Sequence, residues 1–138
     1  MRIRTARAAW LTGLLLAASP AGAEVGDRSP EDLARLASCV LRGTVQRVYT
    51  TTETAAGFRE TTGVAELTVG AIDKGCGGEE LVYARFATRE WVGRGPAPTT
   101  SYGHRGLPRP GQTVRVYLTR GADGGYDVVL PNGFAVLR

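Results

Sequence analysis

Hydrophobic and polar residues alternate along most of the chain after residue 38, and a period of two predicts β-strands. In the clearest run Val114, Val116 and Leu118 share one face, with polar residues between them. An exception is the stretch after Ser29, where Pro30 and two acids predict a short capped helix. We therefore predict an all-β domain with one short N-terminal helix. Its strands are expected at 39–49, 58–72, 81–88, 113–119, 126–130 and 134–137.

Three features of the first two predicted strands and their connection add detail to this predicted fold. Gly43 lies in the middle of a strand, which indicates a bulge or a close approach of another chain segment. Residues 50–57 are polar without apolar periodicity and are expected to form a connection. A hairpin centred near 54–56 places Cys39 opposite about residue 71, a few residues short of Cys76. We therefore expect a Cys39–Cys76 disulfide, worth about 4 kcal/mol in the chain-entropy model, with two free thiols or a metal pair as the alternatives.

The N-terminus has the pattern of a cleaved secretory signal. Arginines at positions 2, 4 and 7 precede an apolar run over 8–18, and small residues end it at Ala21 and Ala23. This pattern predicts a signal peptide over 1–23 and a single domain over 24–138. The alternative is an uncleaved anchor, but a run of about eleven residues is too short to cross a bilayer. The expected location is periplasmic or extracellular, and we expect no transmembrane segment.

Charge is distributed unevenly along the chain. The 138 residues include 17 Lys+Arg and 13 Asp+Glu, a net charge of +4, which falls to +1 once the three arginines of 1–23 are removed. Residues 53–84 carry six acids, whereas residues 85–120 carry seven arginines against Glu90. The two segments can pair across a sheet, or the arginines can form a basic face for an anionic partner. Both interpretations are open at this point.

Catalytic and metal-binding patterns are weak. The chain has one histidine, His104, and no His-x-x-His or Cys-x-x-Cys spacing, so we expect no metal and no cofactor. Ser101 precedes His104 by three residues, but residues 102–120 contain no acid to orient the imidazole. Glu79 and Glu80 are adjacent in a turn, where carboxylates are usually solvated. The sequence therefore predicts a protein that is not an enzyme, and a Ser101–His104 hydrolase is the weakest hypothesis.

The segment 91–111 is the most informative one outside the predicted core. A loop of about twenty residues is uncommon in a compact domain and is usually functional or disordered, and Trp, Tyr and Arg are enriched in binding hot spots. The alternative is that Trp91 folds back to plug the end of the barrel while the arginines are solvated. The candidate binding residues, in this loop and the strand after it, are Trp91, Arg94, Tyr102, His104, Arg105, Arg109 and Arg115.

The order of these elements resembles the netrin-like domain of secreted proteins, which is related to the tissue inhibitors of metalloproteinases. The resemblance rests on the helix, the strand Cys39-Val-Leu-Arg-Gly-Thr-Val, the segment Ile72-Asp-Lys-Gly75 and the strand after Gly111. It implies a small five- to six-stranded OB-like Greek-key barrel with a binding or inhibitory role. Zinc-protease inhibition is not implied, because Cys39 is not at the mature N-terminus and one disulfide at most can form.

Two functions follow from these observations. The leading hypothesis is an exported binding module that engages an envelope or extracellular protein or glycan through the 91–111 loop. The alternative is an anionic polymer, a polysaccharide or a single-stranded nucleic acid, bound by the Arg-rich 85–120 face. Export makes nucleic acid an unlikely ligand. The sequence does not indicate an oligomeric state.

Overall fold

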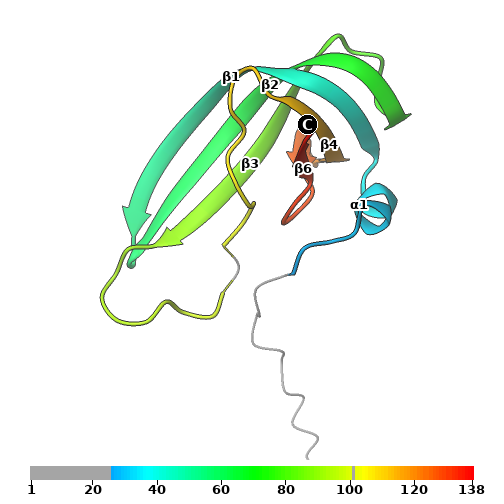
Figure 1. Cartoon of the computed structure of the whole chain (residues 1–138). Helices are drawn as coiled ribbons and strands as arrows, with labels where there is room; N and C mark the ends of the chain where they lie inside the picture. The colour runs from blue at the N-terminus through cyan, green and yellow to red at the C-terminus, as the bar shows by residue number, and fades with distance from the viewer. Residues whose placement is uncertain (1–25, 101) are drawn as a thin grey trace, which may run out of the picture.

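The structure is a computed structural model that describes residues 26–100 and 102–138. The predicted signal peptide over 1–23 and Ser101 lie outside the described residues. One short helix precedes six strands (Figure 1), and their bounds are α1 Pro30–Leu36, β1 Cys39–Ala55, β2 Phe58–Gly75, β3 Leu81–Trp91, β4 Thr113–Arg120, β5 Tyr126–Val128 and β6 Phe134–Val136.

The strands form one sheet that closes on itself. The sheet order is β1-β2-β3-β5-β4-β6, and an additional pairing of β1 with β4 closes a ring of five strands. β3 and β5 run parallel, and the other paired strands run antiparallel. β6 pairs with the part of β4 that also pairs with β1. The predicted all-β fold, a small OB-like barrel with one short helix, is confirmed.

Apolar side chains fill the inside of the ring and a smaller space under α1. Ser29 caps α1 by accepting a hydrogen bond from the Asp32 amide at 3.1 Å, and Leu33 is buried against the outside of the barrel. The main core collects side chains from five strands, so burial of apolar surface holds the ring together. Its members are Cys39, Leu41, Val45, Ala65, Leu67, Val82, Ala84, Phe86, Val114, Val116, Leu118, Tyr126 and Val128.

The predicted connection over 50–57 is wrong. β1 continues to Ala55, and the turn consists of Ala56 and Gly57, with φ of 52° and 80°. Positive φ at both central residues is the geometry that matches the twist of a tight hairpin. The alternating pattern is missing here because residues 49–55 are exposed on both faces of the sheet, so neither face requires apolar side chains. β-branched threonines still favour an extended chain.

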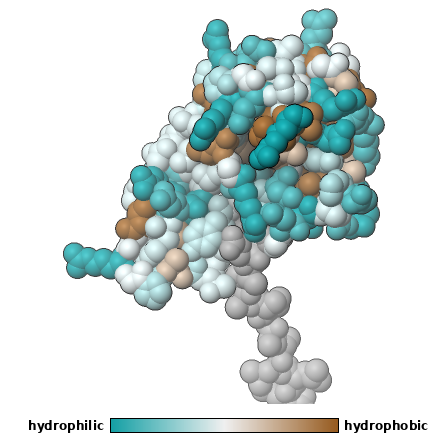
Figure 2. All heavy atoms as spheres, in the orientation of Figure 1, coloured by the Kyte–Doolittle hydropathy of each residue, from teal (hydrophilic) through white to brown (hydrophobic). Residues whose placement is uncertain are grey.

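The β1–β2 hairpin and the end of β3 extend beyond the barrel core. We call residues 48–63 together with 86–91 the arm. In Figure 1 the arm runs to the lower left, away from α1 and β6, and the loop after β3 returns from its end toward β4. The same region is mostly pale in Figure 2, because Thr, Gly, Tyr and Trp have intermediate hydropathy.

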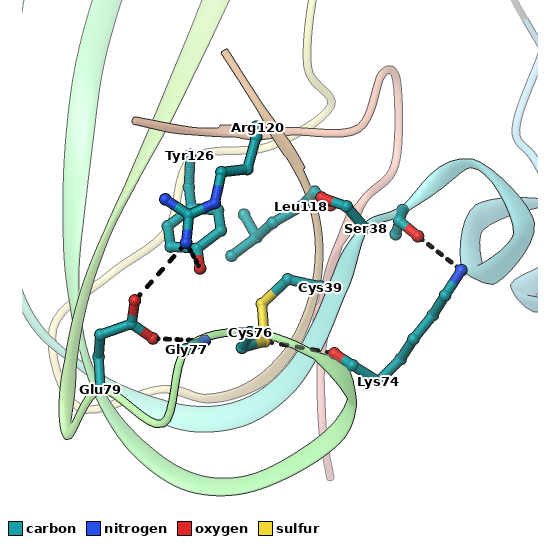
Figure 3. The surroundings of a disulfide bond; sticks show 10 residues. Ser38, Cys39, Lys74, Cys76, Gly77, Glu79, Leu118, Arg120 and Tyr126 are labelled. Atoms are coloured by element: carbon teal, nitrogen blue, oxygen red, sulfur yellow. Dashed lines mark hydrogen bonds and ion pairs between the residues drawn. A yellow bond between two sulfur atoms is a disulfide. The ribbon is translucent and has the colours of Figure 1, made fainter. Parts of the chain in front are cut away.

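The predicted disulfide between Cys39 and Cys76 is confirmed, with the two Cα atoms 4.8 Å apart (Figure 3). Cys39 pairs with Gly75 instead of residue 71, because the turn lies at 56–57 and β1 has three register shifts. Lys74 donates from Nζ to the carbonyl oxygens of Ala34 and Ala37, both at 2.7 Å, and so ties the end of β2 to α1. The disulfide therefore joins the start of β1 to the end of β2, beside the helix.

Candidate binding surface on the arm

Four cross-strand rows of side chains cover the outer face of the arm and its base. Directly opposed residues of an antiparallel sheet point to the same face, and the core residues Ala65 and Ala84 point to the other one. In order toward the tip, the four rows are Tyr49–Val64–Arg85, Thr51–Thr62–Ala87, Glu53–Glu60–Arg89 and Ala55–Phe58–Trp91.

The second row is hollow because its three side chains are small. Thr51, Thr62 and Ala87 are exposed, and the rows on either side carry Tyr49, Arg85 and Arg89. A cavity of about 560 Å³ includes this row in its lining, together with His104, Leu130 and the neighbouring row Thr50–Gly63–Phe86, which points to the inner face. A second hollow of about 190 Å³ also uses Thr62 and Ala87 and reaches Glu60 and Arg89. The larger volume lies within the ordinary range of roughly 300–1,000 Å³ for ligand sites.

The loop after β3 forms one side of this surface because it pairs with the β3 edge. The Arg89 amide donates to the Tyr102 carbonyl at 2.9 Å, and the His104 amide donates to the Ala87 carbonyl at 2.7 Å. Gly103 forms a bridge with Thr88, and its φ of 77° brings it within reach of the β3 backbone. These contacts place a short strand-like segment next to the arm.

The His104 imidazole fastens this segment to two strands. Nε2 lies 2.7 Å from the Val128 carbonyl oxygen, and Nδ1 lies 3.0 Å from the Ala87 amide nitrogen. Nδ1 also lies 3.0 Å from the Ala87 carbonyl oxygen, and with the proton on Nε2 the ring donates to the Val128 carbonyl and accepts from the Ala87 amide. Both ring nitrogens therefore have backbone partners, and His104 acts as a positioning residue for the loop.

Aromatic rings gather at the tip of the arm. Phe58 and Trp91 meet edge to face with ring centroids 4.9 Å apart, and the Tyr102 ring centroid lies 6.1 Å from that of Phe58. The Arg89 guanidinium lies 4.5 Å from the Phe58 ring centroid, a cation–π contact. The Trp91 indole N–H donates to the Gly95 carbonyl at 3.1 Å. We call Phe58, Arg89, Trp91 and Tyr102 the tip cluster.

Trp91 packs at the tip of the arm and not in the end of the barrel, and its surroundings show why. A Cβ atom added to Gly57 would lie 2.4 Å from the indole, and one added to Gly93 would lie 2.5 Å from it. The indole thus fits between two glycines and remains half-buried. Packing and ligand contact are compatible here, because part of the ring still reaches solvent.

Charged groups on the surface are paired with one another. Arg85 donates from Nε to Asp127 at 2.7 Å and from Nη2 to Asp123 at 3.0 Å. The hydrogen bonds from Arg85, followed by that from the Gly125 amide, lower the pKa of Asp123 from 3.8 to about 2. The same carboxylates raise the pKa of Arg85. Arg89 donates from Nε to Glu60 at 2.7 Å. These two arginines are consequently neutralised within the surface.

Ion pairs also decide between the two interpretations of the charge distribution. Arginines of 85–120 contact acids of 53–84 in three places: Arg89 with Glu60, Arg115 with Asp73 at 3.3 Å and Arg120 with Glu79 at 3.8 Å. Pairing between the two segments is therefore confirmed for these residues. Arg94 and Arg109 form no ion pair within the described part of the chain, and both are exposed.

The predicted site residues fall into two groups. Trp91, Tyr102 and His104 lie together at the arm, and Arg94 follows Trp91 by three residues. The other three arginines lie away from the arm or form ion pairs. Arg105 pairs with Asp27 at 2.9 Å, and Arg115 lies on β4 beside Asp73. Arg109 lies in the loop shortly before β4 begins. Arg115 belongs to the barrel wall that pairs with β1 and β6.

Sequence reasoning missed Tyr49, Phe58 and Thr62, and it included Arg85 and Arg89 only in the Arg-rich 85–120 face. Once strands 58–72 and 81–88 were assigned, pairing them about a centre between residues 74 and 75 could have placed Phe58 against Trp91. The sequence signal for Thr62 was weaker, because a small residue indicates a hollow only when its neighbours on adjacent strands are known to be large.

Comparison with known proteins gives no relative from which a function could be transferred. No family model, curated protein or solved structure matches the chain. Among residues 26–100 and 102–138, no group of three or more His, Cys, Asp or Glu side chains is placed to hold a metal ion. No helix in this part of the chain is long and apolar enough to cross a membrane.

Proposed function

We propose that this protein is a non-enzymatic binding module that holds a short segment of a neutral glycan on the outer face of the arm. The observation that carries the proposal is the exposed hollow at Thr51, Thr62 and Ala87, between the tip cluster and the Tyr49 row. The 91–111 loop forms one side of the site through Trp91, Tyr102 and His104.

The chemistry of the surface suits a polyhydroxylated ligand. Half-exposed aromatic rings offer apolar faces to the C–H side of a sugar, and Tyr49 is 50% exposed at the other end of the hollow. Threonine hydroxyls and the ion-paired Arg85, Asp127 and Glu60 offer donors and acceptors in fixed positions. A concave site of this size suits a few sugar units better than it suits a flat protein surface.

The anionic-polymer alternative has less support. An anionic chain requires unpaired cations along its path, whereas Arg85, Arg89, Arg105, Arg115 and Arg120 all contact carboxylates. The hydrolase hypothesis also loses support. His104 contacts backbone groups through both ring nitrogens, which leaves neither nitrogen available as a general base.

The experiment is a titration calorimetry screen of neutral and anionic oligosaccharides at low and high salt, with a matched pair of variants. Thr62→Trp fills the hollow, and we expect it to weaken binding at least about tenfold, through lost contact area and steric exclusion. Thr54→Trp places the same side chain on the opposite face of the arm, and we expect it to bind like the wild type. Circular dichroism checks that both variants are folded.

Each result decides the proposal. A neutral oligosaccharide that binds independently of salt and is lost in Thr62→Trp supports it. Binding of anionic oligosaccharides alone, with an affinity that falls steeply as salt is added, supports the anionic-polymer alternative instead. Equal glycan binding by the two variants shows that the binding site is not on the outer face of the arm. The absence of any glycan ligand rejects the proposal. The netrin-like resemblance and the expected export remain proposals, and both are compatible with an extracellular glycan ligand.

A further inference from the structure

Along its second half, the outer edge of β1 pairs with no strand of residues 26–100 and 102–138. β1 pairs with β4 through residues 39–44, and Val45 then exchanges hydrogen bonds with Gly111 and Gln112. From Gln46 to Ala55 no other described segment pairs with this edge, while β2 occupies the other side. The edge is extended and exposed, and it contains no proline. Such an edge presents a row of unpaired N–H and C=O groups that another strand can bind.

The orientation of the backbone identifies which residues offer these groups. The Tyr49 carbonyl oxygen faces β2, because it lies 2.7 Å from the Cβ position of Gly63. Backbone groups alternate in direction along a strand, and no register shift falls between Val48 and Ala55. Val48, Thr50 and Thr52 therefore point their N–H and C=O groups outward.

Two charges on this edge are placed symmetrically about Thr50. Arg47 and Glu53 each lie three residues away from it, and neither forms an ion pair within the described residues. Glu53 is directly opposite Glu60, a like charge, although Arg89 neutralises Glu60. Arg47 contacts Tyr49, which raises the pKa of its guanidinium, and it lies near Glu66. The edge thus carries a cation and an anion at equal distances, in residues, on either side of Thr50.

We propose that the arm edge binds a second copy of this chain, as two antiparallel β1 strands related by a two-fold axis at Thr50. In this register Thr50 faces Thr50 of the other copy, and Val48 faces Thr52. These outward-pointing residues exchange both of their backbone hydrogen bonds. The same register sets Arg47 of each copy opposite Glu53 of the other, which gives two ion pairs per dimer. The charge complementarity selects a second copy over an unrelated strand, since an isologous contact must be self-complementary.

The test uses charge reversal and mixing in analytical ultracentrifugation. We expect the wild-type protein to dimerise with a dissociation constant below about 1 mM. Arg47→Glu sets two carboxylates against each other at each end of the contact, and Glu53→Arg sets two guanidinium groups against each other there. Each variant alone should therefore weaken the dimer at least about tenfold, because two attractive cross-strand pairs become repulsive.

Mixing the two variants separates the interface from intrachain effects. In a mixed dimer, Arg47→Glu and Glu53→Arg restore two opposite-charge pairs, so the equimolar mixture should regain association close to that of the wild type. The contacts of Arg47 with Tyr49 and Glu66 are lost equally in the single variant and in the mixture. A folding defect would therefore persist in the mixture and could not mimic this result.

A cysteine pair tests the register. Thr50→Cys places two sulfur atoms at the two-fold axis, where opposed Cα atoms lie about 5.5 Å apart, within disulfide range. It should form a covalent dimer under mild oxidation. Thr54→Cys is the control, because it lies on the same face of the same edge but faces residue 46 of the other copy.

The proposal is overturned by a wild-type protein that stays monomeric to about 1 mM, or by a dimer that both charge reversals leave unchanged. Equal crosslinking of the Thr50→Cys and Thr54→Cys variants would also overturn it, since that outcome indicates a sliding or unspecific contact. Capture of an unrelated peptide by the edge without self-association would indicate β-augmentation by a partner and would equally reject the second copy.

Discussion

Gly43 lies at a close approach of two strands of the barrel. β1 shifts register between Arg42 and Gly43, and a Cβ atom at Gly43 would lie 2.5 Å from the Thr68 carbonyl oxygen on β2. A contact of this length forces backbone to move. The close approach predicted from a glycine in mid-strand is therefore confirmed, and the glycine lets the strand bend into a barrel.

Gly43→Ala should lower the free energy of unfolding by about 1–3 kcal/mol, as expected for overpacking in a closed core. Gly70→Ala is the matched control, because its Cβ atom would lie 3.5 Å from the Arg42 carbonyl oxygen, an ordinary contact. We expect that control to change the free energy of unfolding by less than about 0.5 kcal/mol. Urea denaturation measures both, and equal effects would contradict the close approach as the cause.

The contribution of Asp123 to the free energy of unfolding depends on pH. Its pKa is lowered from 3.8 to about 2 in the folded protein, so the folded state binds this proton less readily than the unfolded state. The carboxylate therefore stabilises the fold above about pH 4, and this contribution disappears as the pH falls from 3.8 toward 2. Asp123→Asn should lower the urea midpoint at pH 7, and its difference from the wild type should shrink below about pH 4. A difference that stays constant down to about pH 2 would contradict the Arg85–Asp123 interaction as its source.

At the scale of elements, the β1–β2 hairpin organises the molecule. Its proximal half forms part of the barrel wall, and its distal half carries the arm. The β1–β2 register, three shifts included, brings Cys39 beside Cys76 at one end, and the β2–β3 register places Phe58 against Trp91 at the other end. The proximal end is closed covalently, whereas the distal end depends on ring packing and on the loop contacts of Tyr102 and His104.

Removing the disulfide with Cys39→Ala plus Cys76→Ala should lower the free energy of unfolding by about 4 kcal/mol, because the unfolded chain regains the freedom of the closed loop. Reduction of the wild-type protein with a thiol gives a comparison without a change of side chain. Denaturant titration of all three forms measures the loss. A loss below about 1 kcal/mol would show that the unfolded chain is already restricted in this region.

At the scale of the whole molecule, the barrel and the arm differ in how they are stabilised. The main core takes side chains from every strand of the ring, but from the arm it takes only Phe86, with Val48 packed at its edge. The distal arm depends on backbone pairing, exposed threonines and the tip cluster. Local stability follows buried apolar contact, so the arm should open more readily than the barrel.

Hydrogen exchange should show this difference directly. At protein concentrations low enough to suppress self-association, amides of residues 50–62 should exchange faster than those of residues 65–69 and 114–118. Amides next to the tip cluster should be the slowest within the arm, because rings cover them. Uniform protection along β2 would contradict the division into barrel and arm.

The sequence determined the short-range features of this protein. Alternation placed the strands that bury one face, Ser29 and Pro30 began the helix, Gly43 marked the bend, and the two cysteines indicated their bond. Each of these depends on chemistry within a residue or on neighbours at a fixed spacing. The sequence also predicted three members of the arm surface, Trp91, Tyr102 and His104, from residue type alone.

The tertiary structure decided everything that depends on pairing between distant segments. The extension of β1 through Thr50–Ala55 carries no apolar pattern, because both faces of the arm meet solvent and its stability comes from partners on β2 and β3. The same pairing neutralised arginines of 85–120, and it formed a hollow from Thr51, Thr62 and Ala87. A small side chain forms a hollow only where its neighbours on adjacent strands are large. Strand register decides which residues are neighbours on adjacent strands. The register depends in turn on bulges and turn lengths, which the preferences of single residues do not encode.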